Sequence, residues 1–389
     1  MDFFHTNYWS FHEGRFDEWR SIYPIFVFWL GRLFSGVSSP EMYSATALRV
    51  HDLGAISYLL AAYGLGAAAC AWGLRLHFKN NGSYLRWRYI VAWFFLVLLS
   101  VPGLFAVERG NYILVAFMFL AMSAVSGFTW QAALFLALAI NIKQYLVVLL
   151  FVPLVKQRYD FLLLAVVFAV IPNILGLIAV PEYHYDLLIS NMMGFASSAS
   201  TGFFEKVWCP TSLLAWLKGV QYSSIAHAMQ GSYYEFVYIA MSCAVWAGRL
   251  LALAALSLAA LRGRCLRASY LYFIVLLCLL VVSDAPGGYS LILLLPFVVS
   301  LFERPFARLF TFMVILTFMP MGYTVGPRHH VEYISFLSGK SISGFSILAA
   351  GAYLRPLVLV LFLGIVVADL YFIGINSKEK VEIYGSVNP

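Results

Sequence analysis

Long apolar runs recur along almost the whole chain, and they restrict its fold more than any other feature of the sequence. An α-helix rises 1.5 Å per residue, so about 20 apolar residues cross the hydrocarbon core of a bilayer. Inside lipid every backbone polar group needs an internal partner, which favours helices over open sheets. The clearest runs lie at 54–77, 89–107, 160–181, 235–261, 268–283 and 346–373. We therefore predict an all-α fold, a polytopic transmembrane helix bundle that forms one integral membrane domain over residues 1–389.

The scarcity of charged residues supports this class. Only 11% of the residues are charged, against about 25% in a typical soluble domain. The net charge of +7 does not indicate a nucleic-acid partner, because the basic residues stand in small clusters between apolar runs, as loop charges do. The five cysteines are scattered and odd in number, so we expect neither a disulfide framework nor a metal site. No cofactor is expected.

The basic clusters predict how the chain is oriented in an inner (plasma) membrane. They lie at Lys79–Arg88, Lys156–Arg158, Arg262–Arg267 and Arg304–Arg308. The positive-inside rule places them in the cytoplasm, and their spacing then gives about eleven spans.

The same alternation predicts how the single domain is organised. Residues 1–50 form an outer first loop with an interfacial helix near 21–36, because this short amphipathic run is interrupted by Arg32. An N-terminal helical module at 51–181 and a large outer loop at 182–234 follow. A C-terminal helical module at 235–373 and a cytoplasmic tail at 374–389 complete the chain.

Polar motifs gather on the predicted non-cytoplasmic face, where charges at membrane boundaries tend to mark a site. Asp2 is followed by Gly14-Arg15-Phe16 and Tyr23-Pro24, and a second motif reads Glu108-Arg109-Gly110-Asn111. The other two read Asn141-Ile142-Lys143-Gln144-Tyr145 and Ser283-Asp284-Ala285-Pro286-Gly287-Gly288-Tyr289.

In this order the motifs resemble those of glycosyltransferase family 87, in the C superfamily of polytopic glycosyltransferases. Its members carry an early acidic residue in the first outer loop, an Arg-Gly-Asn or Arg-Gly-Gln turn, a Lys with a nearby Tyr, and a late Tyr before an apolar run. A membrane span precedes the acidic loop in that family, whereas Met1 stands before Asp2 here. The resemblance implies transfer of a sugar, often mannose, from a polyprenyl-phosphate sugar to a glycolipid or glycan acceptor.

Residue chemistry and the resemblance together assign candidate roles. Asp2 matches the position of the family's catalytic base, with Asp17 in reserve, since a carboxylate can take the proton of an attacking hydroxyl. The phosphate of the donor needs positive charge, for which we expect Arg109, Lys143, Lys206 and Arg328. Residues expected to contact substrate are Tyr23, Glu108, Asn111, Tyr145, His184, Asp284 and Tyr289.

Plainer interpretations stand beside these. Glu108 and Arg109 can anchor a helix end at the interface, Lys143 can snorkel towards headgroups, and Asp284 can belong to a simple turn. At the level of function, two alternatives to an enzyme remain. One is a transporter or flippase of lipid-linked saccharides, and the other is a non-catalytic subunit of a polysaccharide assembly complex. Membrane lipids are expected partners under each hypothesis.

Overall fold

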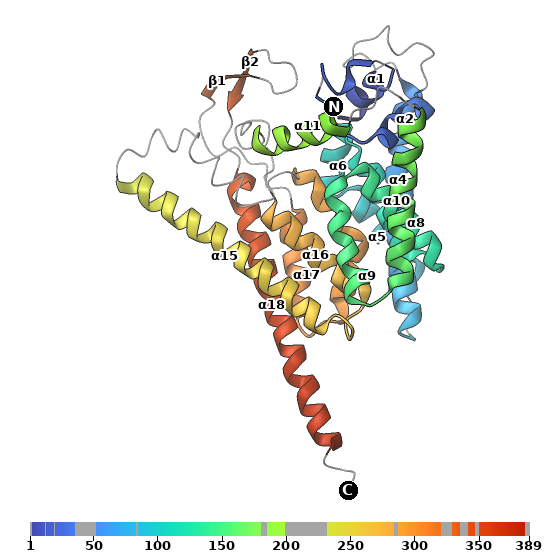
Figure 1. Ribbon diagram of the computed structural model, residues 1–389. Coiled ribbons are helices and arrows are strands. Elements are labelled where there is room, and N and C mark those ends of the chain that lie inside the picture. Colours follow the sequence, from blue (N-terminus) through green and yellow to red (C-terminus); the bar gives the residue numbers. More distant parts are fainter. Residues whose placement is uncertain are drawn as a thin grey trace.

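A computed structural model describes residues 2–11, 13–18, 20–35, 52–82, 85–179, 185–198, 232–283, 287–319, 329–334, 341–346 and 350–385. Most helices run roughly along one direction and form a bundle, with α1, α11 and a β-hairpin at one end and the C-terminus beyond the other (Figure 1). We call these the α1 end and the opposite end.

The N-terminal part is a series of α-helices (α) and 3-10 helices (η). They are α1 (Asp2–Trp9), η1 (Glu13–Arg15), α2 (Ile25–Phe34), α4 (Leu53–Asn80), α5 (Trp87–Leu98), α6 (Val101–Glu108), α7 (Ile113–Val125), α8 (Thr129–Ile142), η3 (Gln144–Leu150), α9 (Phe151–Val155), α10 (Tyr159–Ala179) and α11 (Tyr185–Ser198). The C-terminal part contains α15 (Ser232–Arg262), α16 (Ala268–Val282), η4 (Gly288–Glu303), α17 (Ala307–Phe318), β1 (His329–Ile334), β2 (Ser341–Ser346) and α18 (Ala350–Gly385).

Several helices have the length and composition to cross a membrane. Among the described residues four helices qualify, namely α4, α10, α15 and α18, and the bent pair of α5 and α6 makes a fifth. Seven further apolar helical segments are 10–17 residues long. The chain is thus helical with several membrane-capable helices, as predicted, while the count of about eleven spans stays a prediction.

Three details differ from the sequence-based expectations. A short antiparallel hairpin pairs His329 with Ser346 and Ile334 with Ser341, so the fold is not purely α. The helix α18 continues to Gly385, through much of the segment expected to be a tail. The ten-residue α2 is no difference, since a helix too short to span was expected there, and its interfacial position stays a prediction.

The third difference is a bend in the run at 89–107, where α5 and α6 meet at 45°. Ser100 adopts an extended conformation and Pro102 occupies the first turn of α6, which together end α5. Carbonyl groups near the end of α5 are exposed by the break, and the hydroxyl of Tyr63 donates to those of Val97 and Leu98 at 2.8 and 2.9 Å. Breaks of this kind need such partners in an apolar environment.

Close packing joins α4 to α7. A Cβ atom on Gly66 would lie 2.5 Å from the ring of Phe117 and 3.2 Å from the backbone of Met118. Ala62 and Ala67 on α4 are also buried, so small side chains allow the two backbones to approach.

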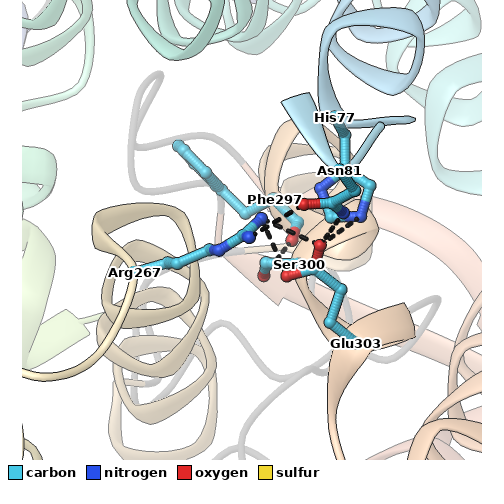
Figure 2. A network of polar contacts seen from close by, with 6 residues as sticks. All are labelled: His77, Asn81, Arg267, Phe297, Ser300 and Glu303. Atoms are coloured by element: carbon cyan, nitrogen blue, oxygen red, sulfur yellow. Dashed lines mark hydrogen bonds and ion pairs between the residues drawn. The ribbon is translucent and has the colours of Figure 1, made fainter. Parts of the chain in front are cut away.

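A polar network ties helix ends together at the opposite end of the bundle (Figure 2). Glu303 forms an ion pair with Arg267 at 2.7 Å, lies 3.2 Å from the Nε2 atom of His77, and accepts a hydrogen bond from Asn81. Arg267 also donates to the side-chain oxygen of Asn81 at 3.0 Å. The termini of α4, α16 and η4 are therefore held together here.

The predicted basic clusters meet at this same end. Lys156 donates to the carbonyl oxygens of Arg264 and Leu266 at 2.9 and 2.5 Å, which brings the turn after α9 against the turn before α16. Arg304 directly follows Glu303 of the network. The clusters thus share one end of the molecule, while the side of the membrane that this end faces stays a prediction.

Candidate functional site

The candidate site is built where α8 ends. Lys143 follows α8 in an extended conformation, and the 3-10 helix η3 then leads back along the bundle. The sequence motif Asn141–Tyr145 therefore marks a break between two apolar helical segments. Such a break puts a polar side chain where an unbroken helix would carry only apolar ones.

Lys143 is buried at this break. Its side-chain nitrogen donates to the hydroxyl oxygen of Tyr23 at 3.0 Å and lies 4.9 Å from the centre of the same ring. The residue is 9% exposed. A buried ammonium needs hydrogen bonds or opposite charge to offset its desolvation, and the Tyr23 hydroxyl and ring supply two such contacts.

The N-terminal segment is clamped over this break. The side-chain amide of Gln144 donates to the carbonyl of Ile22 at 3.0 Å, one residue before Tyr23. From α11, Asn191 donates to the carbonyls of Phe16 and Ser21 at 2.7 and 3.2 Å. The loop between η1 and α2 is therefore fixed on both sides at the α1 end.

Two polar residues that were not predicted from the sequence, Tyr112 and Asn7, lie beside Tyr23. Tyr112 is fully buried, its ring centre lies 5.9 Å from that of Tyr23, and its hydroxyl donates to the side-chain oxygen of Asn7 at 3.0 Å. The amide nitrogen of Asn7 is buried and finds no hydrogen-bond partner among the described residues. Tyr112 directly follows the predicted Asn111, so its place beside the motif was the available signal.

The late motif reaches the same region through η4. The hydroxyl oxygens of Tyr145 and Ser290 lie 3.5 Å apart. Ser290 directly follows the predicted Tyr289. The ring of Tyr289 packs on that of Phe105, with 6.0 Å between the ring centres. The guanidinium of Arg109 lies 5.4 Å from the centre of the same Phe105 ring. Three of the predicted motifs thus connect through aromatic and hydroxyl contacts.

The remaining predicted residues have other positions. Asn111 is buried just before α7, where its side-chain oxygen accepts from the backbone nitrogen of Ile113 at 2.9 Å. Glu108 and Arg109 are exposed at the end of α6. Asp17 is exposed, and its side chain accepts from the backbone nitrogen of Glu18 at 2.8 Å.

The other candidates are placed only in part. Asp2 is the first residue of α1, at the same end of the bundle as Tyr23. The candidates that lie outside the described residues are His184, Lys206, Asp284 and Arg328.

A second buried cation was missed by sequence reasoning. Arg15 is 4% exposed, and its guanidinium lies 5.5 Å from the ring centre of Phe28 on α2. It stands in the quoted Gly14-Arg15-Phe16 motif, but no role was assigned to it. Arg15 and Lys143 are thus two buried basic side chains held by segments of the clamped N-terminal region and the break after α8.

No carboxylate-rich metal site accompanies these cations in the described part of the chain, where no group of three or more His, Cys, Asp or Glu side chains converges. Comparison of the chain with protein-family models, with characterised proteins and with solved structures finds no match.

Proposed function

We propose that the chain is a membrane glycosyltransferase, which moves a sugar, mannose first among the candidates, from a polyprenyl-phosphate donor to a glycolipid or glycan acceptor. The observation that carries this proposal is the buried Lys143 at the break between α8 and η3, hydrogen-bonded to Tyr23. A lysine ammonium beside a tyrosine hydroxyl is suited to a phosphate group, because it offers positive charge and several donors in a place of low dielectric.

The proposed reaction is a single displacement. The acceptor hydroxyl attacks the anomeric carbon, its proton passes to a carboxylate, and the bond between that carbon and the phosphate oxygen breaks. Asp2 or Asp17 is the proposed base. Lys143 and Arg109 stabilise the negative charge that develops on the departing polyprenyl phosphate. One displacement inverts the configuration at the anomeric carbon, and no cofactor takes part.

The proposal includes the architecture that this chemistry needs. In it the chain crosses the plasma membrane about eleven times in a glycosyltransferase C-like fold, with the α1 end on the non-cytoplasmic face. The hydrophobic tail of the donor then remains in lipid while its phosphate reaches Lys143. The exposed apolar side chains Ile189 and Met193 on α11, near the clamped loop, are compatible with an interfacial helix beside that path.

A second candidate is a transporter of lipid-linked saccharides. The observation that favours it is the pair of helix breaks, one between α5 and α6 and one between α8 and η3. Transporters place substrate sites at discontinuous helices. Both candidates bind the same lipid phosphate, so an assay that separates chemistry from movement distinguishes them.

The test uses purified full-length protein in nanodiscs with polyprenyl-phosphate [14C]mannose and an extract of envelope lipids. Transfer of label to a new lipid product, lost in Lys143→Gln and in Asp2→Asn or Asp17→Asn, is the expected result. Lys79→Gln removes an exposed lysine from α4 near the opposite end and serves as the matched control.

Two outcomes would overturn the enzyme proposal. Donor binding without product, together with movement of labelled donor across proteoliposomes, would favour the transporter. Neither binding nor transfer with mannose or with glucose and arabinose donors would remove both candidates and leave the role of a non-catalytic subunit.

A further inference from the structure

A cavity of about 320 Å³ opens at the opposite end of the bundle, away from the candidate active site. It lies between the turn joining α7 to α8, the end of α9, and the beginnings of α10 and α16. The helix α8 separates it from Lys143 by 14 residues, or roughly 20 Å. The cavity therefore belongs to a different part of the molecule.

Lys156 supplies positive charge to the wall of the cavity. Its ammonium donates to two carbonyl oxygens, those of Arg264 and Leu266, at 2.9 and 2.5 Å. These acceptors carry no formal charge and use two of the three ammonium hydrogens. Lys156 is thus held in a fixed position with a donor left for an anion in the cavity.

Arg158 stands on the same wall. It donates to Thr129 at 3.3 Å and to both carboxylate oxygens of Asp160 at 3.2 and 3.3 Å. The hydrogen bonds that it donates to Asp160 raise the pKa of the guanidinium. The pair with Asp160 is more than half exposed on both sides. Water screens such a pair, so a phosphate can share the guanidinium with Asp160.

Two helices also begin at the cavity. Thr129 opens α8 and Ala268 opens α16, and neither of the preceding residues, Phe128 and Arg267, caps its helix with a side-chain hydrogen bond. Free backbone N–H groups in the first turn carry partial positive charge and favour anions. Here they add to the charge of Lys156 and Arg158 rather than acting alone.

Several apolar side chains line the rest of the cavity wall beside a few hydroxyl groups. Val152 and Pro153 of α9, Phe161 of α10 and Phe297 of η4 line it. Phe161 is half-buried and Phe297 is buried. A basic rim over an apolar wall matches a phospholipid, in which a phosphate adjoins acyl chains, and basic pockets between membrane helices bind such headgroups.

We infer that this cavity binds a phosphate group, held by Lys156, Arg158 and the first turns of α8 and α16. The phosphate comes from the headgroup of an anionic phospholipid or from a free phosphate compound. The site is separate from the donor site around Lys143 and does not depend on the proposed transfer reaction.

The test measures lipid binding to the full-length protein by native mass spectrometry after delipidation in detergent. Phosphatidylglycerol is the anionic probe, phosphatidylcholine has the same phosphate without net charge, and inorganic phosphate is added as competitor. We expect one phosphatidylglycerol to bind more tightly than phosphatidylcholine. Lys156→Gln and Arg158→Gln should each weaken that binding by roughly tenfold, because each removes a charged hydrogen bond.

Two further variants control the test. Arg88→Gln removes an exposed arginine of α5 that does not line the cavity, so it should leave the affinity unchanged. Ala268→Trp fills the mouth of the cavity without altering charge, so it should abolish binding even if Lys156→Gln loses stability as well as charge.

Each result decides the matter. Phosphatidylglycerol binding that inorganic phosphate does not displace identifies a lipid site, and displacement at millimolar concentration identifies a site for free phosphate. The inference would be overturned if Lys156→Gln, Arg158→Gln and Ala268→Trp all bound phosphatidylglycerol as tightly as the native protein. It would also be overturned if Arg88→Gln lost as much affinity as the cavity variants.

Discussion

The side-chain nitrogen of Lys143 lies 3.0 Å from the hydroxyl oxygen of Tyr23, although the two residues are 120 positions apart in the chain. One comes from the loop before α2 and the other from the break after α8. Burial of an ammonium against a phenol weakens the folded state unless other groups compensate it. The pair places an ammonium and a hydroxyl side by side at the break, and both groups can donate hydrogen bonds to a phosphate, which is why it is central to the proposed donor site.

Replacement of Lys143 by Met tests whether this lysine contributes more to donor binding than to the stability of the folded protein. Substituting buried charge by an apolar side chain of similar length is often neutral for stability. We expect donor binding to fall at least tenfold, in line with the loss of a charged hydrogen bond, while the melting temperature changes by only a few degrees. Thermal unfolding in detergent and a donor-binding assay measure the two quantities. A variant that fails to fold would show a structural role instead.

Replacement of Tyr23 by Phe separates the hydroxyl from the ring. The ring contact with Lys143 remains, but the ammonium loses an acceptor, and the expected cost is about 1–3 kcal/mol of unfolding free energy. Tyr112→Phe is the matched control at the neighbouring ring, because it removes a hydrogen bond between neutral groups, to Asn7. The control should cost about 0.5–1.5 kcal/mol. An equal cost in both variants would argue against a special role for the pair.

Two ion pairs near the opposite end should differ in strength because they differ in burial. Asp369 of α18 is fully buried and accepts from Arg304 at 2.8 and 2.9 Å and from Tyr270 at 2.9 Å. Asp369→Ala leaves Arg304 and Tyr270 without this acceptor, and we expect a loss of about 3–5 kcal/mol.

The more exposed pair of Arg267 and Glu303 provides the comparison. Its coupling energy in a double-mutant cycle should lie near 0.2–1 kcal/mol and fall as salt is added. Thermal unfolding at low and high ionic strength checks both pairs. Equal losses at the two sites would mean that burial does not set the strength of these contacts.

The helices were predictable because hydrophobic length alone identifies an apolar segment. The predicted runs at 160–181, 235–261 and 268–283 lie close to α10, α15 and α16. The bend between α5 and α6 was missed, because it depends on Tyr63 of another helix satisfying the carbonyls of Val97 and Leu98. Local sequence contains Pro102 as a hint, but it does not contain that distant partner.

The candidate site was predictable at the level of motifs and not of contacts. Lys143, Tyr23 and Tyr145 were singled out by their positions in motifs, and the first two are in direct contact. Which side chain would be buried against which depends on the packing of α1, α2 and η4, and periodicity carries no information on that. Asn7 and Ser290 were therefore missed, since a single Asn or Ser in an apolar context has no distinguishing pattern.

Two glycines on the same helix provide a test of the packing between α4 and α7. A Cβ at Gly66 would overlap the ring of Phe117 at 2.5 Å, whereas a Cβ at Gly64 would meet nothing within 4 Å. Gly66→Ala should lower the unfolding free energy by about 1–3 kcal/mol through overpacking. Gly64→Ala should change it by no more than about 1 kcal/mol, towards higher stability. Unfolding in mixed detergent measures both, and a harmless Gly66→Ala would mean that the helices lie further apart.

The orientation in the membrane can be tested with single cysteines placed at the two ends. In a chain whose five native cysteines are replaced by Ser, Asp17→Cys and Lys79→Cys each introduce a thiol at an exposed position. The positive-inside rule predicts that a membrane-impermeant maleimide labels the first in intact cells and the second only after permeabilisation. Val170→Cys, at an exposed apolar position in the middle of α10, should resist the reagent in both conditions if lipid covers it. The reverse pattern for the first two variants would place the α1 end in the cytoplasm, where a donor facing the other side could not reach Lys143.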